Sequence, residues 1–286
     1  MAKEKTKKTK GFGYRFTHNK AAMIGLIILV LELLVFFIGP SVYPIDPNQA
    51  GAGGFNAAPD AAHILGTDTL GRDCLSRLLY GGRTSLFIGI SAMAISVLLG
   101  SVLGLLAGYF RGACEAIVMR LADIFMSFPT TILALVLVAV VGPSIGTVIG
   151  VIGVLGWPGI AKLLYGNVIA TRNQEYVEAS RIMGMSNFRI IMRDILPNSI
   201  TPLLMAMPFR MSQAILTESS LSFLGAGIQA PQASWGNIIY AAQNLTVFTM
   251  RPWIWIPPGL CIIVTVVAIN LLGEGLRAAM DPKSAK

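Results

Sequence analysis

Six long apolar runs set the strongest limit on what this chain can fold into. We predict transmembrane helices over the runs at residues 21–39, 84–110, 113–141, 145–165, 199–225 and 253–280. An α-helix rises about 1.5 Å per residue, so each run is about long enough to cross a hydrocarbon core of about 30 Å. Lipid offers no hydrogen-bond partner to the backbone, which must therefore be helical in such runs. The sequence predicts an all-α, polytopic membrane protein with six transmembrane helices.

The composition agrees with this class and argues against a nucleic-acid-binding protein. Only 13% of the 286 residues are charged, and 54% are hydrophobic, whereas soluble domains carry about 25% charged residues. The net charge of +8 comes from basic residues at the ends of apolar runs, not from one face of a folded domain. That placement is typical of membrane topology. We expect a lipid bilayer around this chain and no nucleic acid.

The distribution of Lys and Arg predicts the orientation. If the chain crosses six times, both ends lie on one side, together with residues 166–198. With Arg111, Arg120, Lys162 and Arg277 counted on it as well, that side would carry seventeen Lys and Arg residues, against four on the other. Lys and Arg are enriched in cytoplasmic loops, so we predict cytoplasmic termini, with a basic tail over 1–20 and a short tail over 283–286. Residues 40–83 and 226–252 would then be extracytoplasmic loops.

Four ionisable side chains lie in or near the predicted spans: Glu32, Asp123, Arg210 and Glu218. A charge at the bilayer centre costs roughly 2.5–3.5 kcal/mol or more, so these residues should face protein or water. Arg210 and Glu218 are eight residues apart and are expected on one helix face. They could line a translocation path, with Asp123 as a third candidate, or form a structural ion pair or hydrogen bond. Glu32 is expected to snorkel or to contact another helix.

Small residues on one face of the second span indicate a close helix contact. Gly100, Gly104 and Gly108 repeat every four residues. In lipid, such small-residue faces let two helix backbones approach each other closely. We predict a structural role for this series.

The chain has no visible catalytic or energy-supplying site. It contains no G-x-x-x-x-G-K-[ST] loop, and no Gly-Lys pair at all, so it cannot bind ATP through a P-loop of its own. Its two histidines, His18 and His63, and its three cysteines are too scattered for metal ligation. We expect no catalytic residue, no metal site and no cofactor bound by this chain.

The segment 173–198 is polar and amphipathic in an otherwise apolar chain. Gln174–Met183 is predicted to form a short helix, with Gly184 at its C′ position. Ser186 is predicted to cap a second helix that Pro197 closely follows. The apolar side chains available for contacts are those of Val177, Ile182, Phe188, Ile191 and Ile195. The pattern predicts a compact knob, which would fit a groove on another protein.

Motifs in this segment are similar to those of a known family. Glu178-Ala179-Ser180, then Gly184, then Ile195-Leu196-Pro197 resemble the EAA loop of ATP-binding cassette (ABC) importer permeases. Further stretches resemble the C-type subunit of the oligopeptide/dipeptide/nickel permeases: GTDTLGRDCLSRLLYGGRTSL (66–86), EYVEASRIMGMSNFRIIMRDILPN (175–198), ESSLSFLGAGIQAPQASWG (218–236), PWIWIPPG (252–259) and NLLGEGLRAAMDP (270–282). The resemblance covers roughly residues 20–282.

The resemblance implies a type I ABC importer permease fold, with the transmembrane domain over 84–282 and the coupling loop over 166–198. That loop would enter a cleft on an ATPase subunit. The residues expected to carry coupling are Glu178, Ala179, Ser180, Arg181, Gly184, Phe188 and Pro197. Three positions depart from the pattern: Ser180 replaces an alanine, Asp194 stands where a histidine is expected, and Cys74 where an aliphatic residue is common.

The resemblance also implies partners and a location. The complex would contain a homologous B-type permease, two ABC ATPases that use ATP and magnesium, and an extracytoplasmic substrate-binding protein. The binding protein would meet the loops 40–83 and 226–252, where Asp68, Arg72, Asp73 and Trp235 are candidate docking residues. The expected location is a bacterial or archaeal cell membrane, the inner membrane in a Gram-negative organism.

The cargo and the class of protein leave alternatives. Peptides are the favoured cargo, while nickel or a metal chelate, glutathione and antimicrobial peptides are carried by the same architecture. A membrane scaffold or sensor without transport activity would also explain the spans, but it would not explain the spacing of the EAA motif.

Overall fold

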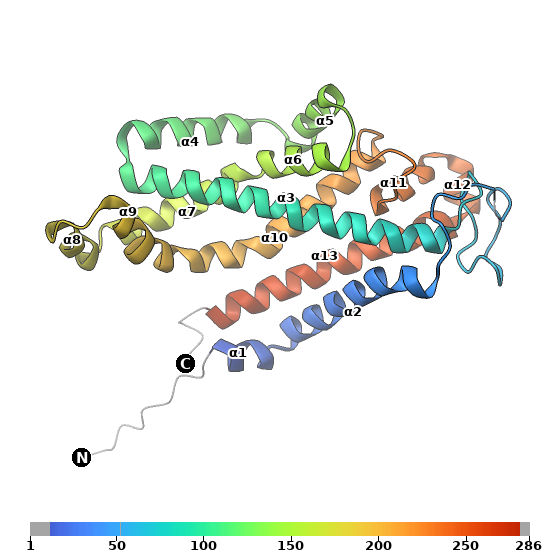
Figure 1. Ribbon diagram of the computed structural model, residues 1–286, viewed down its shortest axis with the longest axis horizontal. Coiled ribbons are helices and arrows are strands. Elements are labelled where there is room, and N and C mark those ends of the chain that lie inside the picture. The colour runs from blue at the N-terminus through green and yellow to red at the C-terminus, as the bar shows by residue number, and fades with distance from the viewer. Residues whose placement is uncertain (1–11, 52, 281–286) are drawn as a thin grey trace, which may run out of the picture.

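The computed structural model describes residues 12–51 and 53–280, and every regular element within them is helical (Figure 1). The predicted tails lie partly (1–20) or wholly (283–286) outside these residues. The elements are α1 (Phe12–His18), α2 (Lys20–Val42), α3 (Cys74–Phe110), α4 (Gly112–Ser127), α5 (Thr130–Val141), α6 (Ile145–Leu155), α7 (Trp157–Arg172), α8 (Glu175–Ile182), α9 (Asn187–Ile190), the π-helical turn η1 (Ile191–Ile195), α10 (Leu196–Phe223), α11 (Trp235–Ile239), the 3₁₀ turn η2 (Tyr240–Gln243), α12 (Leu245–Met250) and α13 (Pro252–Met280).

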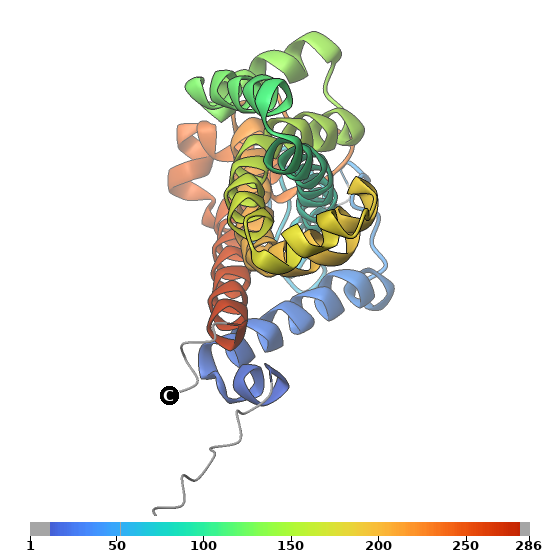
Figure 2. The same ribbon diagram turned by 90° about the vertical axis from the view of Figure 1, so that its left-hand side faces the viewer.

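The long helices run between two distinct ends of an elongated bundle (Figure 1). At one end, α8 and α9 project beyond the other helices, and α1 and the end of α13 lie on the same side. We call residues 173–198 the knob. At the opposite end lie residues 43–73 with α11 and α12, which we call the loop end. Seen from the knob end, α2 and α13 form a pair to one side of the other long helices (Figure 2).

Four helices of the described chain are long and apolar enough to cross a membrane: α2, α3, the joined α6–α7 and α13. A fifth crossing results if α4 and α5 count as one. The remaining long helix, α10, has 28 residues but is not apolar enough to be included. Helices therefore occupy all six predicted positions, whereas the count of six spans and their orientation stay predictions.

The predicted continuous span over 113–141 is wrong in one respect. Its two parts, α4 and α5, meet at 91°. Phe128 and Pro129 between them have extended ψ angles of 143° and 118°. A proline disfavours the helical conformation of the residue before it and cannot donate a backbone hydrogen bond, which accounts for the break.

The boundaries of the two predicted loops also change. α3 begins at Cys74, ten residues before the predicted start of the span, because Asp73 caps it: the Ser76 N–H donates to Asp73 Oδ1 at 2.7 Å. The second loop, 226–252, contains α11, η2 and α12. The second predicted loop is therefore largely helical, whereas residues 43–73 contain no helix among those described.

The predicted glycine contact is confirmed, and its partner is α7. A Cβ added at Gly104 would lie 2.6 Å from the Ala161 carbonyl oxygen, and one at Gly108 would lie 2.7 Å from Val168 Cβ. Both distances are too short for a real side chain. The α3 and α7 backbones therefore pack directly on each other, as small-residue faces allow.

α3 is the central helix of the bundle. On one side its Ile88 and Ala92 belong to a buried apolar cluster with α5, α6 and α10. On another side its Leu79 and Leu86 join a cluster with α2, α11 and α13. This helix therefore connects the two parts of the bundle and positions both the cavity and the loop end described below.

Candidate coupling knob and translocation cavity

The first helix of the knob ends as the sequence predicts. Gly184 has a φ of +76°, a conformation that glycine adopts at little cost. Its N–H donates to the Arg181 carbonyl at 3.0 Å, and the Met185 N–H donates to the Ser180 carbonyl at 3.2 Å. These two bonds make a Schellman motif, so the turn after α8 has a defined geometry.

The second helix of the knob does not end before Pro197. Ser186 caps α9 as predicted, accepting the Arg189 N–H at 3.4 Å. The chain then continues through the π-helical turn η1 directly into α10, with Pro197 in the first turn of α10. Pro197 lacks an N–H and its ring crowds the preceding turn, and the wider π turn lies immediately before it. The second helix of the knob is thus continuous with α10, whereas α8 remains a separate helix before the turn at Gly184.

The apolar residues of the knob divide into a base and a ridge. The base (Val177, Ile190 and Ile195) is fully buried against α3 and α7, beside Tyr109 and Leu164. The ridge consists of Ile182, Met183 and Phe188, which are 82%, 72% and 73% exposed. Large apolar groups this exposed at a projecting tip indicate a contact surface for another protein.

The other predicted coupling residues surround this ridge. Glu178, Ala179, Arg181 and Pro197 are exposed, whereas Ser180 is buried. The Arg181 guanidinium lies 6.0 Å from the centre of the Tyr109 ring, and the Tyr109 hydroxyl donates to Asn187 Oδ1 at 2.7 Å. Tyr109 therefore fastens the end of α3 to the knob. Asp194 Oδ2 is buried and has no hydrogen-bond partner among the described residues.

Arg210 of α10 borders a cavity of about 460 Å³. Its guanidinium donates from Nε to Ser96 Oγ at 3.2 Å, from Nη2 to the Ile152 carbonyl at 2.9 Å and from Nη1 to Gln213 Oε1 at 3.2 Å. The cavity is lined mainly by α4, α5, α6, α7 and α10: Phe125, Met126, Thr130, Leu155, Gly156, Pro158, Gly159, Ile160, Leu163, Ala206, Phe209, Arg210 and Gln213.

Glu218 does not share this environment, contrary to the predicted common face. Eight residues of α-helix turn through about 80° more than two full turns, so the two side chains diverge. Glu218 is fully buried and accepts hydroxyl donors from Ser222 at 2.8 Å and Ser85 at 3.4 Å. It forms no ion pair with Arg210, and its hydrogen bond to Ser85 joins α10 to α3.

The two other predicted intramembrane acids have partners on neighbouring helices. Asp123 Oδ1 accepts from Lys162 Nζ at 2.7 Å, and both side chains are exposed, which joins α4 to α7. Glu32 Oε2 accepts from the Thr265 hydroxyl at 2.9 Å. The expected contact of Glu32 with another helix is therefore made, and that helix is α13.

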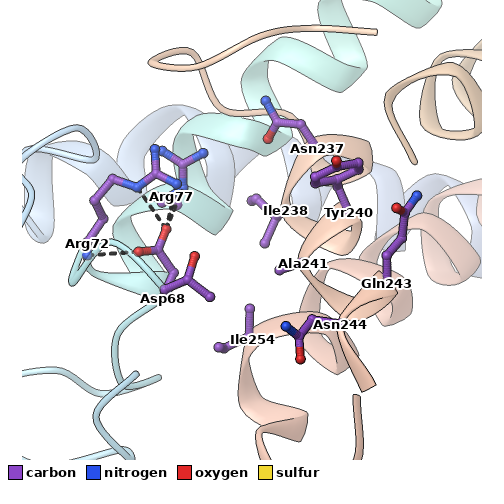
Figure 3. A pocket seen from close by; sticks show the side chains of 11 residues that line it. Asp68, Arg72, Arg77, Asn237, Ile238, Tyr240, Ala241, Gln243, Asn244 and Ile254 are labelled. Atoms are coloured by element: carbon purple, nitrogen blue, oxygen red, sulfur yellow. Dashed lines mark hydrogen bonds and ion pairs between the residues drawn. The ribbon is translucent and has the colours of Figure 1, made fainter. Parts of the chain in front are cut away.

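The loop end contains a second cavity, of about 390 Å³ (Figure 3). On one side, Asp68 Oδ2 accepts from Arg72 Nη2 at 2.7 Å and lies 3.6 Å from Arg77 Nε. Across the cavity lie polar side chains from α11, η2 and the start of α12: Asn237, Tyr240, Gln243 and Asn244. Arg72 is partly buried, with its side chain 13% exposed, whereas Asp68 and Arg77 are buried.

Asp73 and Trp235, the other two candidate docking residues, belong to the interior of the loop end. Asp73 is 1% exposed, and its Oδ2 accepts from the Tyr43 hydroxyl at 3.0 Å and lies 2.8 Å from His63 Nδ1. Burial, then the hydrogen bond to Asp73, raises the pKa of Tyr43 to about 12, so this phenol remains a donor at neutral pH. Trp235 has no exposed surface and packs on Phe36.

Several further residues that shape these sites are not predictable from local sequence patterns. Ser96 and Gln213 hold Arg210, and a Cβ at Gly156 would collide with Arg210 Nη2 and with Ser96 Oγ. Arg77 flanks the loop-end cavity. The only sequence signal for any of them was the Gly156-Trp-Pro turn between two helices, because the rest depends on contacts between distant helices.

Comparison with known proteins identifies the class to which this fold and these sites belong. Residues 100–286 match the family described as "Binding-protein-dependent transport system inner membrane component". Residues 9–59 match the "N-terminal TM domain of oligopeptide transport permease C". The chain therefore belongs to the inner-membrane permeases of binding-protein-dependent ABC importers, and it is a multi-pass membrane protein.

Individual relatives place the chain more narrowly within that class. It is 38% identical over 282 residues to the di/tripeptide transport system permease protein of Pseudomonas aeruginosa, covering 96% of this chain and 92% of that protein. It is 37% identical over 273 residues to the glutathione transport system permease protein of Pectobacterium atrosepticum, covering 95% and 90%. A chain of the methionine ABC transporter MetNI, in an inward-facing conformation, has a similar fold, with a TM-score of 0.58 at 19% identity over 71% of this chain and 96% of that one.

Proposed function

We propose that this chain forms half of the translocation path of an ATP-driven importer for di- and oligopeptides. The other half would be a homologous B-type permease, and an extracytoplasmic binding protein would deliver the peptide. Two ABC ATPases would bind and hydrolyse ATP with magnesium, so the chain itself would be a non-catalytic subunit. Relatives named for di- and tripeptide transport support the choice of cargo.

The observation that carries this proposal is the exposed ridge of Ile182, Met183 and Phe188 on a buried base. Three large apolar side chains would not remain in water at the tip of a projecting knob without a partner. The buried base and the defined turn at Gly184 make the ridge a stiff element. An ATPase cleft that closes on the ridge would therefore move the knob as a unit.

The continuous path from knob to cavity supports a coupling role. α9 passes through η1 into α10, and α10 carries Arg210 at the cavity. A displacement at Phe188 would thus reach the cavity along the continuous helical segment of α9, η1 and α10, without crossing a loop. This is a rigid-body mode of coupling.

The test is uptake by the complete complex. Membrane vesicles that contain this chain, its partner permease, the ATPases and the loaded binding protein should accumulate a labelled dipeptide only when ATP is supplied. A Gly184→Trp variant should insert and assemble, because open space surrounds Gly184, yet should lose most uptake, since a side chain strains the turn there. Undiminished uptake by this variant would refute the coupling role of the knob.

Glutathione is the second candidate cargo, because one close relative carries that name. A competition assay with unlabelled ligands distinguishes dipeptide from glutathione as the transported cargo. An excess of unlabelled dipeptide should suppress labelled dipeptide uptake, whereas glutathione should not. Nickel ions should have no effect in the same assay.

A further inference from the structure

Arg210 is a cation that is fixed in place but not neutralised. It forms no ion pair with any described residue, and the acceptors of its three hydrogen bonds are a hydroxyl, an amide and a backbone carbonyl. These neutral groups orient the guanidinium and leave its charge uncompensated. A guanidinium has five N–H donors, so one donor remains on each of Nη1 and Nη2.

The cavity beside Arg210 has the size and lining of a site for a small organic ligand. Its volume of about 460 Å³ falls within the range of about 300–1,000 Å³ that is common for such sites. Its walls are mostly apolar, and the few polar side chains include Arg210, Gln213 and Thr130. An uncompensated cation in apolar surroundings is a strong attractor for an anion.

The packing around Gly156 makes room for the guanidinium in this position. A Cβ at Gly156 would collide with Arg210 Nη2 and Ser96 Oγ. Gly156 has a φ of −89°, which any residue adopts, so glycine is required here for space and not for backbone conformation. The chain thus holds the charge at the cavity wall through a specific steric arrangement.

We propose that Arg210 binds the free carboxylate of the transported peptide during its passage through this cavity. The inference rests on the proposed function and adds to it the chemical group that is recognised. The planar guanidinium fork matches a carboxylate through two parallel N–H donors. Every unmodified peptide has a terminal carboxylate, whatever its side chains. A site that binds this group therefore accepts peptides of any sequence.

The experiment compares a dipeptide with its C-terminal amide in ATP-dependent uptake by vesicles that hold the complete complex. The affinity of the binding protein for each ligand is measured first. The binding protein is then supplied saturated with one ligand at a time, so that a difference in its affinity for the two ligands does not change its occupancy in the comparison of uptake rates. Loss of one charge-assisted contact is worth a factor of about ten or more, so the native complex should transport the acid about tenfold faster than the amide. Arg210→Gln should bring this ratio close to one, mainly by slowing the acid.

A second variant displaces the guanidinium without removing it. Gly156→Ala retains Arg210 but fills the space that its Nη2 occupies, so it should lower the acid-to-amide ratio as Arg210→Gln does. Gly166→Ala is the matched control, because a Cβ at Gly166 has no neighbour within 4 Å and Gly166 does not line the cavity. The control should keep the native ratio. Co-purification of the partner permease reports assembly of each variant.

The outcomes separate this inference from the proposed function. A native complex that transports acid and amide equally fast, or variants that assemble and keep the native ratio, would overturn the carboxylate site and leave peptide transport intact. Should Arg210→Gln fail to assemble, the ratio in Gly156→Ala decides between the same two results. A native complex that hydrolyses ATP but accumulates neither ligand would instead refute the proposed peptide cargo.

Discussion

The knob and the loop end differ in where their predicted contact residues lie: mostly on the surface at the knob, and mostly in the interior at the loop end. At the knob, the residues expected to bind a partner are mostly on the surface, and Phe188 is 73% exposed. At the loop end, Asp73 and Trp235 are buried, and they hold other side chains in place. A strong motif can therefore indicate either a contact surface or the internal frame of a surface, and only the structure distinguishes the two.

The largest effect on stability is expected from removing Asp73, whose hydrogen bonds hold the loop end together. Asp73→Ala removes the cap of α3 and leaves Tyr43 and His63 without their shared acceptor. We expect a loss of about 3 kcal/mol in stability, measured by thermal unfolding of the purified protein together with faster proteolysis of residues 43–73. Asp46→Ala is the control: Asp46 is exposed on the same segment and accepts one N–H, from Asn48. Equal destabilisation by the two variants would contradict a framing role for Asp73.

A smaller effect, of a different kind, is expected at the ridge. Phe188→Ala should leave the thermal unfolding of the isolated chain unchanged, because Phe188 makes little contact within the chain. It should weaken binding of the ATPase subunits by about 2 kcal/mol, which is typical of a central aromatic contact and is measurable by titration of the purified permease with ATPase.

Phe55→Ala provides the matched control for this prediction. Phe55 is 71% exposed but lies at the loop end, so its removal should not change ATPase binding. The comparison of the two ends fails if both phenylalanine variants bind ATPase as tightly as the native chain does.

The smallest effect should come from the cap of α9. Ser186→Ala removes one hydrogen bond of 3.4 Å at an exposed position, at a cost of about 0.5 kcal/mol, the low end for helix caps. Hydrogen exchange of the α9 amides should accelerate, while exchange in α8 should not. Acceleration in both helices would mean that the two halves of the knob open together.

Local chemistry explains which features could be predicted from sequence. The turn at Gly184, the cap at Ser186 and the close contact at Gly104 each depend on neighbouring residues or on one helix face, and all three were found. The break at Pro129 carried an equally local signal, which the long apolar run obscured. In contrast, Ser85 on α3, whose hydroxyl donates to Glu218, is 133 residues away in sequence. A contact over that distance cannot be predicted from the spacing of residues along one helix.

The direct packing of α3 on α7 has a practical consequence for following the transport cycle. Two helices whose backbones touch at Gly104 and Gly108 cannot slide past each other without a collision. Spin labels placed on the exposed faces of α3 and α7 should therefore keep one separation in every nucleotide state. The distance between these two labels would be a fixed reference. A change in the distance from either of them to a label on α4, α10 or the knob would then measure movement of that element.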